Sequence, residues 1–113
     1  MERRRLLQEN ESSTTGAVKI ADKPIKIYVH FDLKGAAPKL SYFQKLFPLL
    51  HQWGAHGICI EYEDMFPFDG IVANVKHKQA YSKTDIEKIN QLAQENNLDV
   101  MPLLQTYGKI WLN

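Results

Sequence analysis

The sequence predicts an α/β fold built from three parallel strands and two helices. Two runs of β-branched, apolar and aromatic residues predict strands, and a later apolar run predicts a third. The two stretches between these runs show helical spacing of apolar residues. The resulting β-α-β-α-β order implies parallel strands joined by right-handed crossovers. The 113 residues leave room for one compact domain.

The first strand and the first helix are predicted in the first half of this region. Residues 25–31 (IKIYVHF) alternate as a strand with one apolar face, which contains Ile25, Ile27, Val29 and Phe31. After a loop, residues 41–53 show helical spacing of aromatic and aliphatic side chains, and Gly54 ends the helix. Pro48 lies inside this pattern and has no backbone N–H, so we expect a kink or a late start of the helix.

The second half of the region repeats the pattern. Residues 57–62 (GICIEY) predict a second buried strand, and residues 98–104 (LDVMPLL) predict a third. Between them, a helix is predicted over about 83–96. Ser82 and Asp85 have the spacing of a capping box at the start of this helix, in which each side chain accepts a hydrogen bond from the backbone N–H of the other.

Residues 1–24 differ in composition from the rest of the chain. They lack hydrophobic periodicity, are rich in Glu, Ser and Thr, and carry five basic and four acidic side chains. This composition predicts a disordered N-terminal tail. The ordered domain is therefore predicted to begin at residue 25.

Composition and charge exclude several classes of protein. Lys and Arg total 14 against 13 Asp and Glu, so the basic excess of a general nucleic-acid binder is missing. No apolar run is long enough to cross a membrane. The single cysteine, Cys59, excludes an internal disulfide and a cysteine-rich zinc site and fits a reducing compartment. Since no secretory signal is recognisable, we expect a cytoplasmic location, with the nucleus as the alternative.

Two architectures fit the order of elements: an open doubly wound sheet and the opening of a (β/α)8 barrel. Dinucleotide binding by a doubly wound fold would require a glycine-rich turn after the first strand, but that turn contains one glycine, Gly35. Polar side chains gather toward the carboxyl ends of the predicted strands, as the rim of a barrel active site requires. Solvated strand ends would give the same pattern, so spacing leaves both explanations open.

The polar residues at the strand ends are the candidate functional residues. In chain order they are Asp32, Lys34, Glu61, Glu63, Asp64 and Gln105. Residues 46–75 contain no Lys or Arg, so the acidic members lack basic neighbours in the sequence. Carboxylates at this spacing are weak evidence for a metal site, and the four histidines lack the spacing of metal ligands. No metal or cofactor is predicted.

Three segments carry a resemblance to a known family. They are HFDLKGAAPKLSYFQKLFPLL from His30, GAHGICIEYEDMFPF from Gly54 and AYSKTDIEKINQLAQENNLDVMPLLQTYG from Ala80. The order of LKGAAPK, EYEDMFPF and QTYG is the most specific part of the match. Together these segments resemble the β-N-acetylhexosaminidases of glycoside hydrolase family 20, over roughly residues 25–108.

The resemblance implies that residues 25–108 form the opening of a TIM-barrel catalytic domain. It also implies substrate-assisted hydrolysis of terminal N-acetylhexosamine residues, in which the acetamido oxygen of the sugar attacks the anomeric carbon. In such enzymes an adjacent Asp-Glu pair after the fourth strand supplies the general acid and base and orients the acetamido group. The sequence contains no Asp-Glu dipeptide, and Glu63-Asp64 has the reverse order. No catalytic residue is therefore predicted, and the chain is expected to be inactive at this length.

The same resemblance suggests which residues contact the sugar. Carboxylates, amides and ammonium groups at strand ends suit hydroxyl recognition. The predicted contacts to the N-acetylhexosamine-containing substrate of the full-length enzyme are Asp32, Lys34, Glu61, Glu63, Asp64 and Gln105. An arginine near the first strand binds sugar hydroxyls in the wider family, but Lys26 and Ile27 occupy that neighbourhood here, so its role is not transferred. Tyr62, Phe66 and Phe68 are candidates for sugar stacking, although core packing is the commoner role of such residues.

The resemblance stops after Gly108. Lys109 follows Gly108 where the family has Gly-His, and we interpret residues 109–113 (KIWLN) as a divergent end produced by intron read-through or an alternative exon. A truncated isoform or gene model is therefore expected. Two other functions remain open: a non-catalytic fragment that binds or regulates the full-length enzyme, and an unrelated small α/β binding domain, which the matching motifs disfavour.

Overall fold

The computed structural model of the chain describes residues 25–105. It contains three strands, β1 (Tyr28–Asp32), β2 (Gly57–Glu61) and β3 (Asp99–Pro102), and two α-helices, α2 (Leu40–Gln52) and α3 (Lys83–Glu95). Two 3-10 helices, η1 (Glu63–Met65) and η2 (Gly70–Val75), lie between β2 and α3. The predicted β-α-β-α-β order is confirmed. The predicted tail at 1–24 and the divergent end at 109–113 lie outside the described residues.

The strands form one open sheet in the order β1-β2-β3, and both pairs are parallel, as predicted. Residues that pair across parallel strands point to the same face of the sheet. On the face that packs against the helices, the register gives the rows Val29–Ile58–Val100 and Phe31–Ile60–Pro102. On the opposite face it gives Tyr28–Gly57–Asp99, His30–Cys59–Met101 and Asp32–Glu61. We call this second face the open face. Closure into a barrel is not seen in the described residues.

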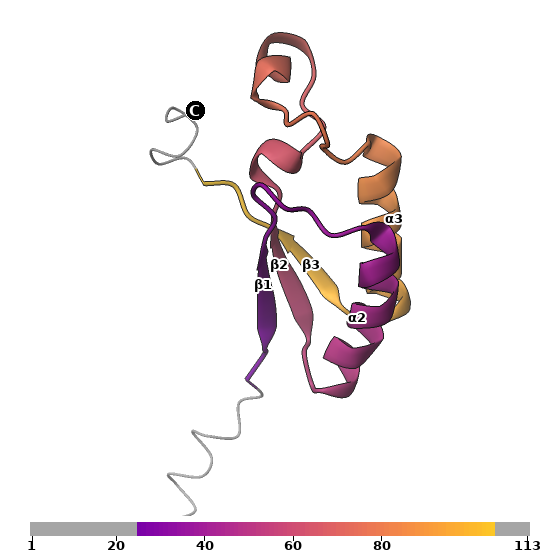
Figure 1. Cartoon of the computed structure of the whole chain (residues 1–113). Coiled ribbons are helices and arrows are strands. Elements are labelled where there is room, and N and C mark those ends of the chain that lie inside the picture. The colour runs from indigo at the N-terminus through magenta and orange to yellow at the C-terminus, as the bar shows by residue number, and fades with distance from the viewer. Residues whose placement is uncertain (1–24, 106–113) are drawn as a thin grey trace, which may run out of the picture.

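The hydrophobic core lies between the sheet and the two helices, which sit side by side on one side of the sheet (Figure 1). Ile58 and Ile60 of β2 are completely buried. Phe43 and Phe47 of α2 pack against them as a ring pair with centroids 5.2 Å apart. The core is therefore organised around the central strand. Over residues 25–105, no helix is long and apolar enough to span a membrane.

The first strand is shorter than predicted. Ile25 and Ile27 were expected on its apolar face, but they precede β1 and are 80% and 52% exposed. The backbone of Ile27 bonds instead to His56: its N–H donates to Nδ1, and its carbonyl accepts from the His56 N–H at 2.8 Å. Since β2 begins at Gly57, residues 25–27 have no strand beside them in the described part of the chain. The third strand is also shorter than the predicted 98–104: the Leu98 N–H donates to the Ala93 carbonyl of α3, and beyond Pro102 the Leu103 N–H donates to the Ile60 carbonyl of β2.

Helix α2 runs through Pro48 without interruption, so the expected late start is wrong. The missing N–H of Pro48 leaves the carbonyl of Gln44 without its helical donor. Both residues lie on the exposed side of the helix, where water can replace that bond. The buried side is formed by Phe43, Phe47 and Leu50.

The predicted capping box of α3 is confirmed. The Asp85 N–H donates to Oγ of Ser82 at 3.1 Å, and the Ser82 N–H donates to Oδ2 of Asp85 at 2.9 Å. These bonds hold the pKa of Asp85 below its ordinary value of 3.8. The helix ends at Glu95, with Asn96 as its C-cap, within a residue of the predicted end.

Gly57 is required on the open face because a neighbouring side chain crosses over it. A Cβ at this position would lie 2.7 Å from the backbone oxygen of Asp99 and 2.7 Å from Cδ1 of Tyr28. The Tyr28 ring passes above β2, and its hydroxyl donates to Oδ2 of Asp99 on β3 at 3.1 Å. This bond raises the pKa of Tyr28. The glycine thus allows β1 and β3 to be linked across the strand between them.

Replacing Gly57 with alanine is expected to lower the free energy of unfolding by about 1–3 kcal/mol, the usual cost of overpacking. The measurement is urea-induced unfolding followed by circular dichroism. Adding Tyr28→Ala should recover part of the loss, because the ring contact is removed while the contact with the Asp99 backbone remains. An unchanged midpoint for Gly57→Ala would contradict the close approach.

The capping box predicts an acid-sensitive part of the stability. Because the folded-state pKa of Asp85 is lowered, its contribution is complete above the ordinary value of 3.8 and is lost as the pH falls through the lower folded value. Asp85→Asn should therefore reduce the dependence of unfolding on pH below about 4. Ser82→Ala should cost about 1 kcal/mol at neutral pH. Identical acid profiles for the wild type and Asp85→Asn would refute this role.

Candidate functional site

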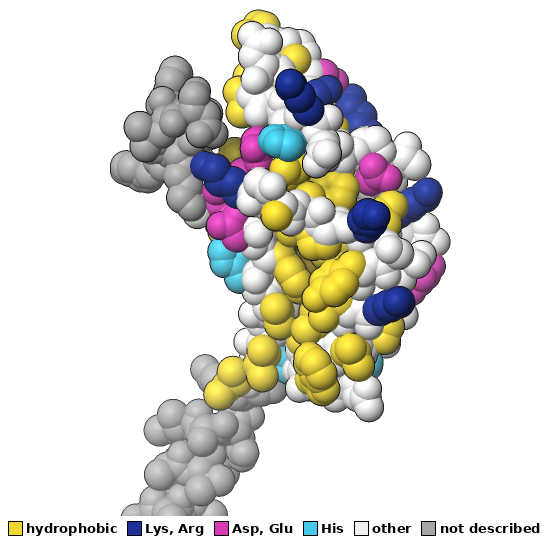
Figure 2. All heavy atoms as spheres, viewed as in Figure 1, with side chains coloured by type: hydrophobic (Ala, Val, Ile, Leu, Met, Phe, Trp, Pro, Cys, Tyr) yellow, Lys and Arg dark blue, Asp and Glu magenta, His cyan; other side chains and the backbone are white. Residues whose placement is uncertain are grey.

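The candidate site lies where the carboxyl ends of the three parallel strands meet. Asp32 is the last residue of β1, Glu61 is the last of β2, and residues 103–105 follow β3. The Leu33 N–H donates to the Glu61 carbonyl at 2.9 Å, and the Leu103 N–H donates to the Ile60 carbonyl at 2.9 Å. The chain therefore continues the parallel pairing beyond the strands. In Figure 2, acidic, lysine and histidine side chains gather at this end, above a hydrophobic area.

A cavity of about 300 Å³ opens at this end of the sheet. Its wall includes five of the six residues predicted from the sequence: Lys34, Glu61, Glu63, Asp64 and Gln105. The sixth, Asp32, lies beside it, with a carboxylate oxygen within 4.8 Å of those of Glu61 and Glu63. The structure thus brings all six predicted residues to one place. Their contact with sugar stays a prediction.

Glu61 is the buried charged side chain of residues 25–105, with 1% of its surface exposed. Its Oε2 lies 3.1 Å from Nε2 of His30 on β1, at hydrogen-bond distance. Its Oε1 is buried and has no hydrogen-bond partner among the described residues. A buried acceptor without a donor costs free energy, so this oxygen is suited to a ligand that supplies one.

Lys34 and Glu63 form the mixed-charge side of the cavity. Nζ of Lys34 lies 3.3 Å from Oε2 of Glu63, and both side chains are partly exposed. The Lys34 N–H also donates to Oδ1 of Asp32 at 3.1 Å, which fixes the start of the loop after β1. Glu63 has a φ of 47°, in the left-handed region that non-glycine residues rarely occupy. Such strain is often found at functional sites.

Asp64 is held by the loop that follows it. Its carbonyl accepts a hydrogen bond from the His77 N–H at 2.7 Å, which ties the end of η2 back to η1. Oδ1 of Asp64 is buried without a hydrogen-bond partner among residues 25–105. The cavity is thus lined by two side chains, Glu61 and Asp64, that each have an unsatisfied acceptor oxygen.

The part of the wall that comes from the loop between β2 and α3 was only partly predicted from the sequence. Asn74 and Val75 of η2 were not predicted, whereas Phe68, which precedes them, was predicted as a candidate stacking residue. The signal in the sequence was the Asp69-Gly70 dipeptide, which is typical of a turn and immediately precedes η2. His30 alternates with Val29 and Phe31 of β1, and its contact with Glu61 depends on the register of β1 and β2, which the sequence pattern does not specify.

The three candidate stacking residues take different positions. Tyr62 is buried in the core, and burial is the main cause that raises its pKa. Its ring makes an edge contact with Tyr81, whose pKa is raised to about 12, again mainly by burial. Phe66 and Phe68 are more exposed and lie together, with ring centroids 5.0 Å apart. Of the three, Phe68 contributes to the 300 Å³ cavity.

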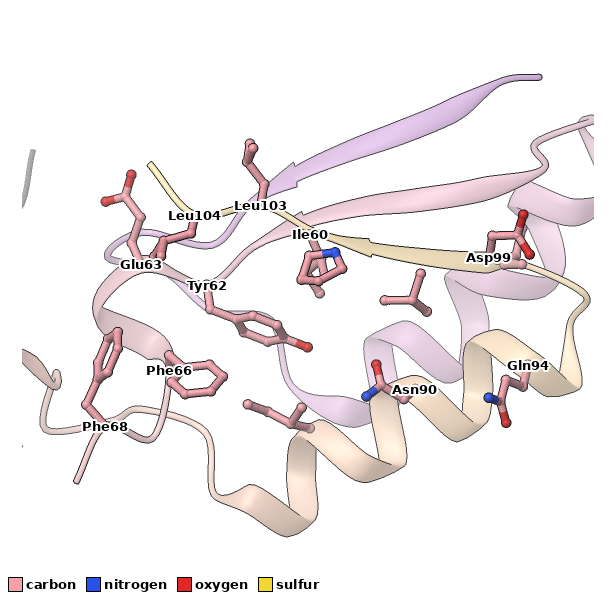
Figure 3. Close-up of a pocket in the computed structure, with 14 residues that line it drawn as sticks. Ile60, Tyr62, Glu63, Phe66, Phe68, Asn90, Gln94, Asp99, Leu103 and Leu104 are labelled. Atoms are coloured by element: carbon pink, nitrogen blue, oxygen red, sulfur yellow. The ribbon is translucent and has the colours of Figure 1, made fainter. Parts of the chain in front are cut away.

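A second, larger hollow of about 730 Å³ runs along β3 and α3. Figure 3 shows Tyr62 pointing across it from the end of β2, Phe66 and Phe68 at one end, and Asn90 and Gln94 rising from α3. Most of its wall is apolar, including Ile86, Val100 and Pro102. It therefore lies on the helix-covered side of the sheet, along β3, which pairs with β2 alone among the described residues.

Comparison with known proteins agrees with the sequence motifs. No family model matches the chain. Hexosaminidase D of Homo sapiens is 52% identical over 80 residues, which make up 71% of this chain and 16% of the human protein. Hexosaminidase D of Bos taurus is likewise 52% identical over 80 residues, or 71% of this chain and 23% of the bovine protein.

The chain therefore spans less than a quarter of the length of these two relatives. The identity extends over most of the chain, and its level is far above what chance similarity gives over 80 residues. The family resemblance predicted from the LKGAAPK, EYEDMFPF and QTYG motifs is confirmed: the chain is a relative of hexosaminidase D and corresponds to a fragment of that protein.

Proposed function

We propose that this chain forms part of the substrate-binding end of a β-N-acetylhexosaminidase, as the first three strands of a (β/α)8 barrel. In this proposal the terminal N-acetylhexosamine of a glycoconjugate contacts Asp32, Lys34, Glu61, Glu63, Asp64 and Gln105. The observation that carries the proposal is the meeting of these six residues at the carboxyl end of one parallel sheet. That end is where enzymes with parallel α/β barrels bind their substrates.

The arrangement of the sheet supports the barrel. The strands follow one another in sequence order, and both helices cover the same face. β1 and β3 each pair on one side only among the described residues, and an apolar hollow lies along β3. Unpaired edges and large apolar surfaces are unfavourable in water. Further β/α units that paired with these edges would remove both.

The chemistry of the cavity supports sugar binding. A sugar presents hydroxyl groups that both donate and accept hydrogen bonds. Its hydroxyls would satisfy the buried acceptors on Glu61 and Asp64, which have no donor among residues 25–105. Leaving such an acceptor unpaired costs about 1–3 kcal/mol, so binding gains from these bonds. Lys34 and the amide of Gln105 add donors on the same wall.

Hydrolysis is proposed to belong to the full-length enzyme and not to this chain. The substrate-assisted reaction implied by the resemblance uses an adjacent Asp-Glu pair, and the 113 residues contain none. The carboxylates of the cavity would therefore bind and orient the sugar without supplying the catalytic pair. The reaction implied by the resemblance needs no cofactor.

An alternative role is a non-catalytic chain that binds or regulates the full-length enzyme. The edges of β1 and β3 that are unpaired within residues 25–105 favour it, because an unpaired strand edge can pair with a strand of another chain. The two roles differ in whether the presence of the chain changes the activity of the complete enzyme.

Titration with the methyl β-glycosides of N-acetylgalactosamine and N-acetylglucosamine is expected to shift NMR amide resonances of residues 32–34 and 61–64. Glu61→Gln should weaken binding about tenfold or more, because hydrogen bonds to a charged group contribute about 1.5–3 kcal/mol. Glu87→Gln makes the same chemical change on the exposed side of α3 and should leave the affinity unchanged. Equal affinity for Glu61→Gln and the wild type would contradict the proposed contact.

The purified chain is expected not to hydrolyse a chromogenic aryl N-acetylhexosaminide above the buffer blank. In a parallel assay, equimolar chain is added to full-length hexosaminidase D. Co-purification with an altered rate would favour the regulatory alternative, and an unchanged rate without binding would favour the substrate-binding role. Hydrolysis by the chain that is lost in Glu63→Gln would show that the chain is itself catalytic.

A further inference from the structure

We infer that Asp32, Glu61 and Glu63 form a binding site for a divalent cation, and that Ca²⁺ is the ion that fits it best. The site lies at the carboxyl ends of β1 and β2. No metal was predicted from the sequence, because the three carboxylates converge only through the pairing of two strands. The inference does not depend on sugar binding, since the ion can be tested in the absence of sugar.

The geometry places three carboxylates within reach of one ion. One oxygen from each of Asp32, Glu61 and Glu63 can be chosen so that all three lie within 4.8 Å of one another. Ca²⁺ binds oxygen at about 2.3–2.6 Å, so two ligands on opposite sides of it are about 4.6–5.2 Å apart. Mg²⁺ binds at about 2.0–2.1 Å in a strict octahedron and spans only about 4.2 Å. Ca²⁺ accepts a flexible arrangement of carboxylate oxygens, whereas Mg²⁺ requires the strict octahedron, so three carboxylates from two strands and the turn after them suit Ca²⁺ better.

A buried acceptor provides independent evidence for a ligand at this point. Glu61 is 1% exposed and lines the cavity, and its Oε1 is buried with no hydrogen-bond partner among the described residues. Its other oxygen already faces His30. An ionised carboxylate is costly to bury unless it is paired or coordinates a metal. A cation bound by Oε1 would satisfy that requirement.

The surrounding charges also favour a cation. Within residues 25–105, the cavity wall carries three acidic residues, Glu61, Glu63 and Asp64, with Asp32 beside it, while its lysine is Lys34 and His30 lies against Glu61. Nζ of Lys34 lies 3.3 Å from Glu63, and its side chain is 37% exposed, so it can turn toward solvent when an ion arrives. Oδ1 of Asp64, buried without a hydrogen-bond partner in the described part of the chain, offers a further oxygen on the same wall.

Isothermal titration calorimetry of the 113-residue chain in metal-free buffer tests this inference. CaCl₂ is expected to bind with a Kd on the order of 10⁻⁴–10⁻³ M, the range of weak calcium modules, and MgCl₂ more weakly. Thermal unfolding followed by circular dichroism should show a Tm that rises with the Ca²⁺ concentration. Glu61→Gln and Asp32→Asn should each weaken Ca²⁺ binding by about tenfold or more. Glu87→Gln is the matched control and should bind as the wild type does.

The use of two variants separates ion binding from folding. Glu61 is buried and its replacement can disturb the sheet, whereas Asp32 is exposed and its replacement leaves the core intact. Absence of binding heat and of any Tm change up to about 10 mM Ca²⁺, ten times the weakest expected Kd, would overturn the site. So would wild-type affinity in Asp32→Asn or an equal loss in Glu87→Gln. Equal affinity for Mg²⁺ would overturn the choice of calcium. A sugar titration that fails while Ca²⁺ binds would reject the proposed function and retain the cation site.

Discussion

Successive side chains of the central strand, β2, point to opposite faces of the sheet, so one face forms the core and the other contributes to the candidate site. β2 directs Ile58 and Ile60 into the helix-covered face, where both are completely buried, and directs Cys59 and Glu61 to the open face. β1 and β3 adopt the same division because each pairs with β2 in parallel register. A shift of one residue along β2 would exchange the two sets of side chains, and a carboxylate would then enter the core. The hydrophobic requirement of the core therefore also fixes the position of Glu61.

Glu61 combines an unfavourable burial with a position in the candidate site. A buried carboxylate is unfavourable by itself, and the hydrogen bond with His30 compensates one of its two oxygens. Replacing it with an apolar residue would remove that cost, as replacement of buried charges by well-packed apolar residues often does. The register pairs Asp32 with Glu61, so the same strand contact that builds the sheet also brings two negative charges together. A ligand that donated a hydrogen bond to Oε1 of Glu61, or coordinated it, would offset the cost of burying this carboxylate.

Local sequence signals predicted which helices and strands form. The exact ends of the strands depend on pairing between segments far apart in the chain, which these signals do not contain. The capping box at Ser82 and Asp85 places the start of α3 correctly because both partners lie within one turn. The strand predicted over 25–31 starts before β1 does. The apolar pattern includes Ile25 and Ile27, but the pairing with β2 begins only at Tyr28. Alternation alone carries no information about where a neighbouring strand begins.

The candidate site, too, could be predicted only as far as local sequence patterns allow. The six strand-end residues could be predicted because parallel strands bring their carboxyl ends to one edge of the sheet. The contribution of η2 could not, because a 3-10 segment in a long loop has neither the period of a helix nor that of a strand. The distances among the carboxylates, and their contact with His30, arise from the register of two strands far apart in the chain.

The loop between β2 and α3 is attached to the rest of the molecule near its two ends. Near those ends, the Tyr81 N–H donates to the Met65 carbonyl at 2.9 Å, and the Tyr81 hydroxyl donates to the Pro38 carbonyl at 2.5 Å. The segment between these anchors contains η2, which buries no residue, and Ile71 at its surface is fully exposed. Insertions and substitutions in this segment would therefore leave the core contacts of the sheet intact. Sequence changes in this loop would alter the shape of the cavity wall, whereas changes in the strands that hold the acidic side chains would also disturb the core.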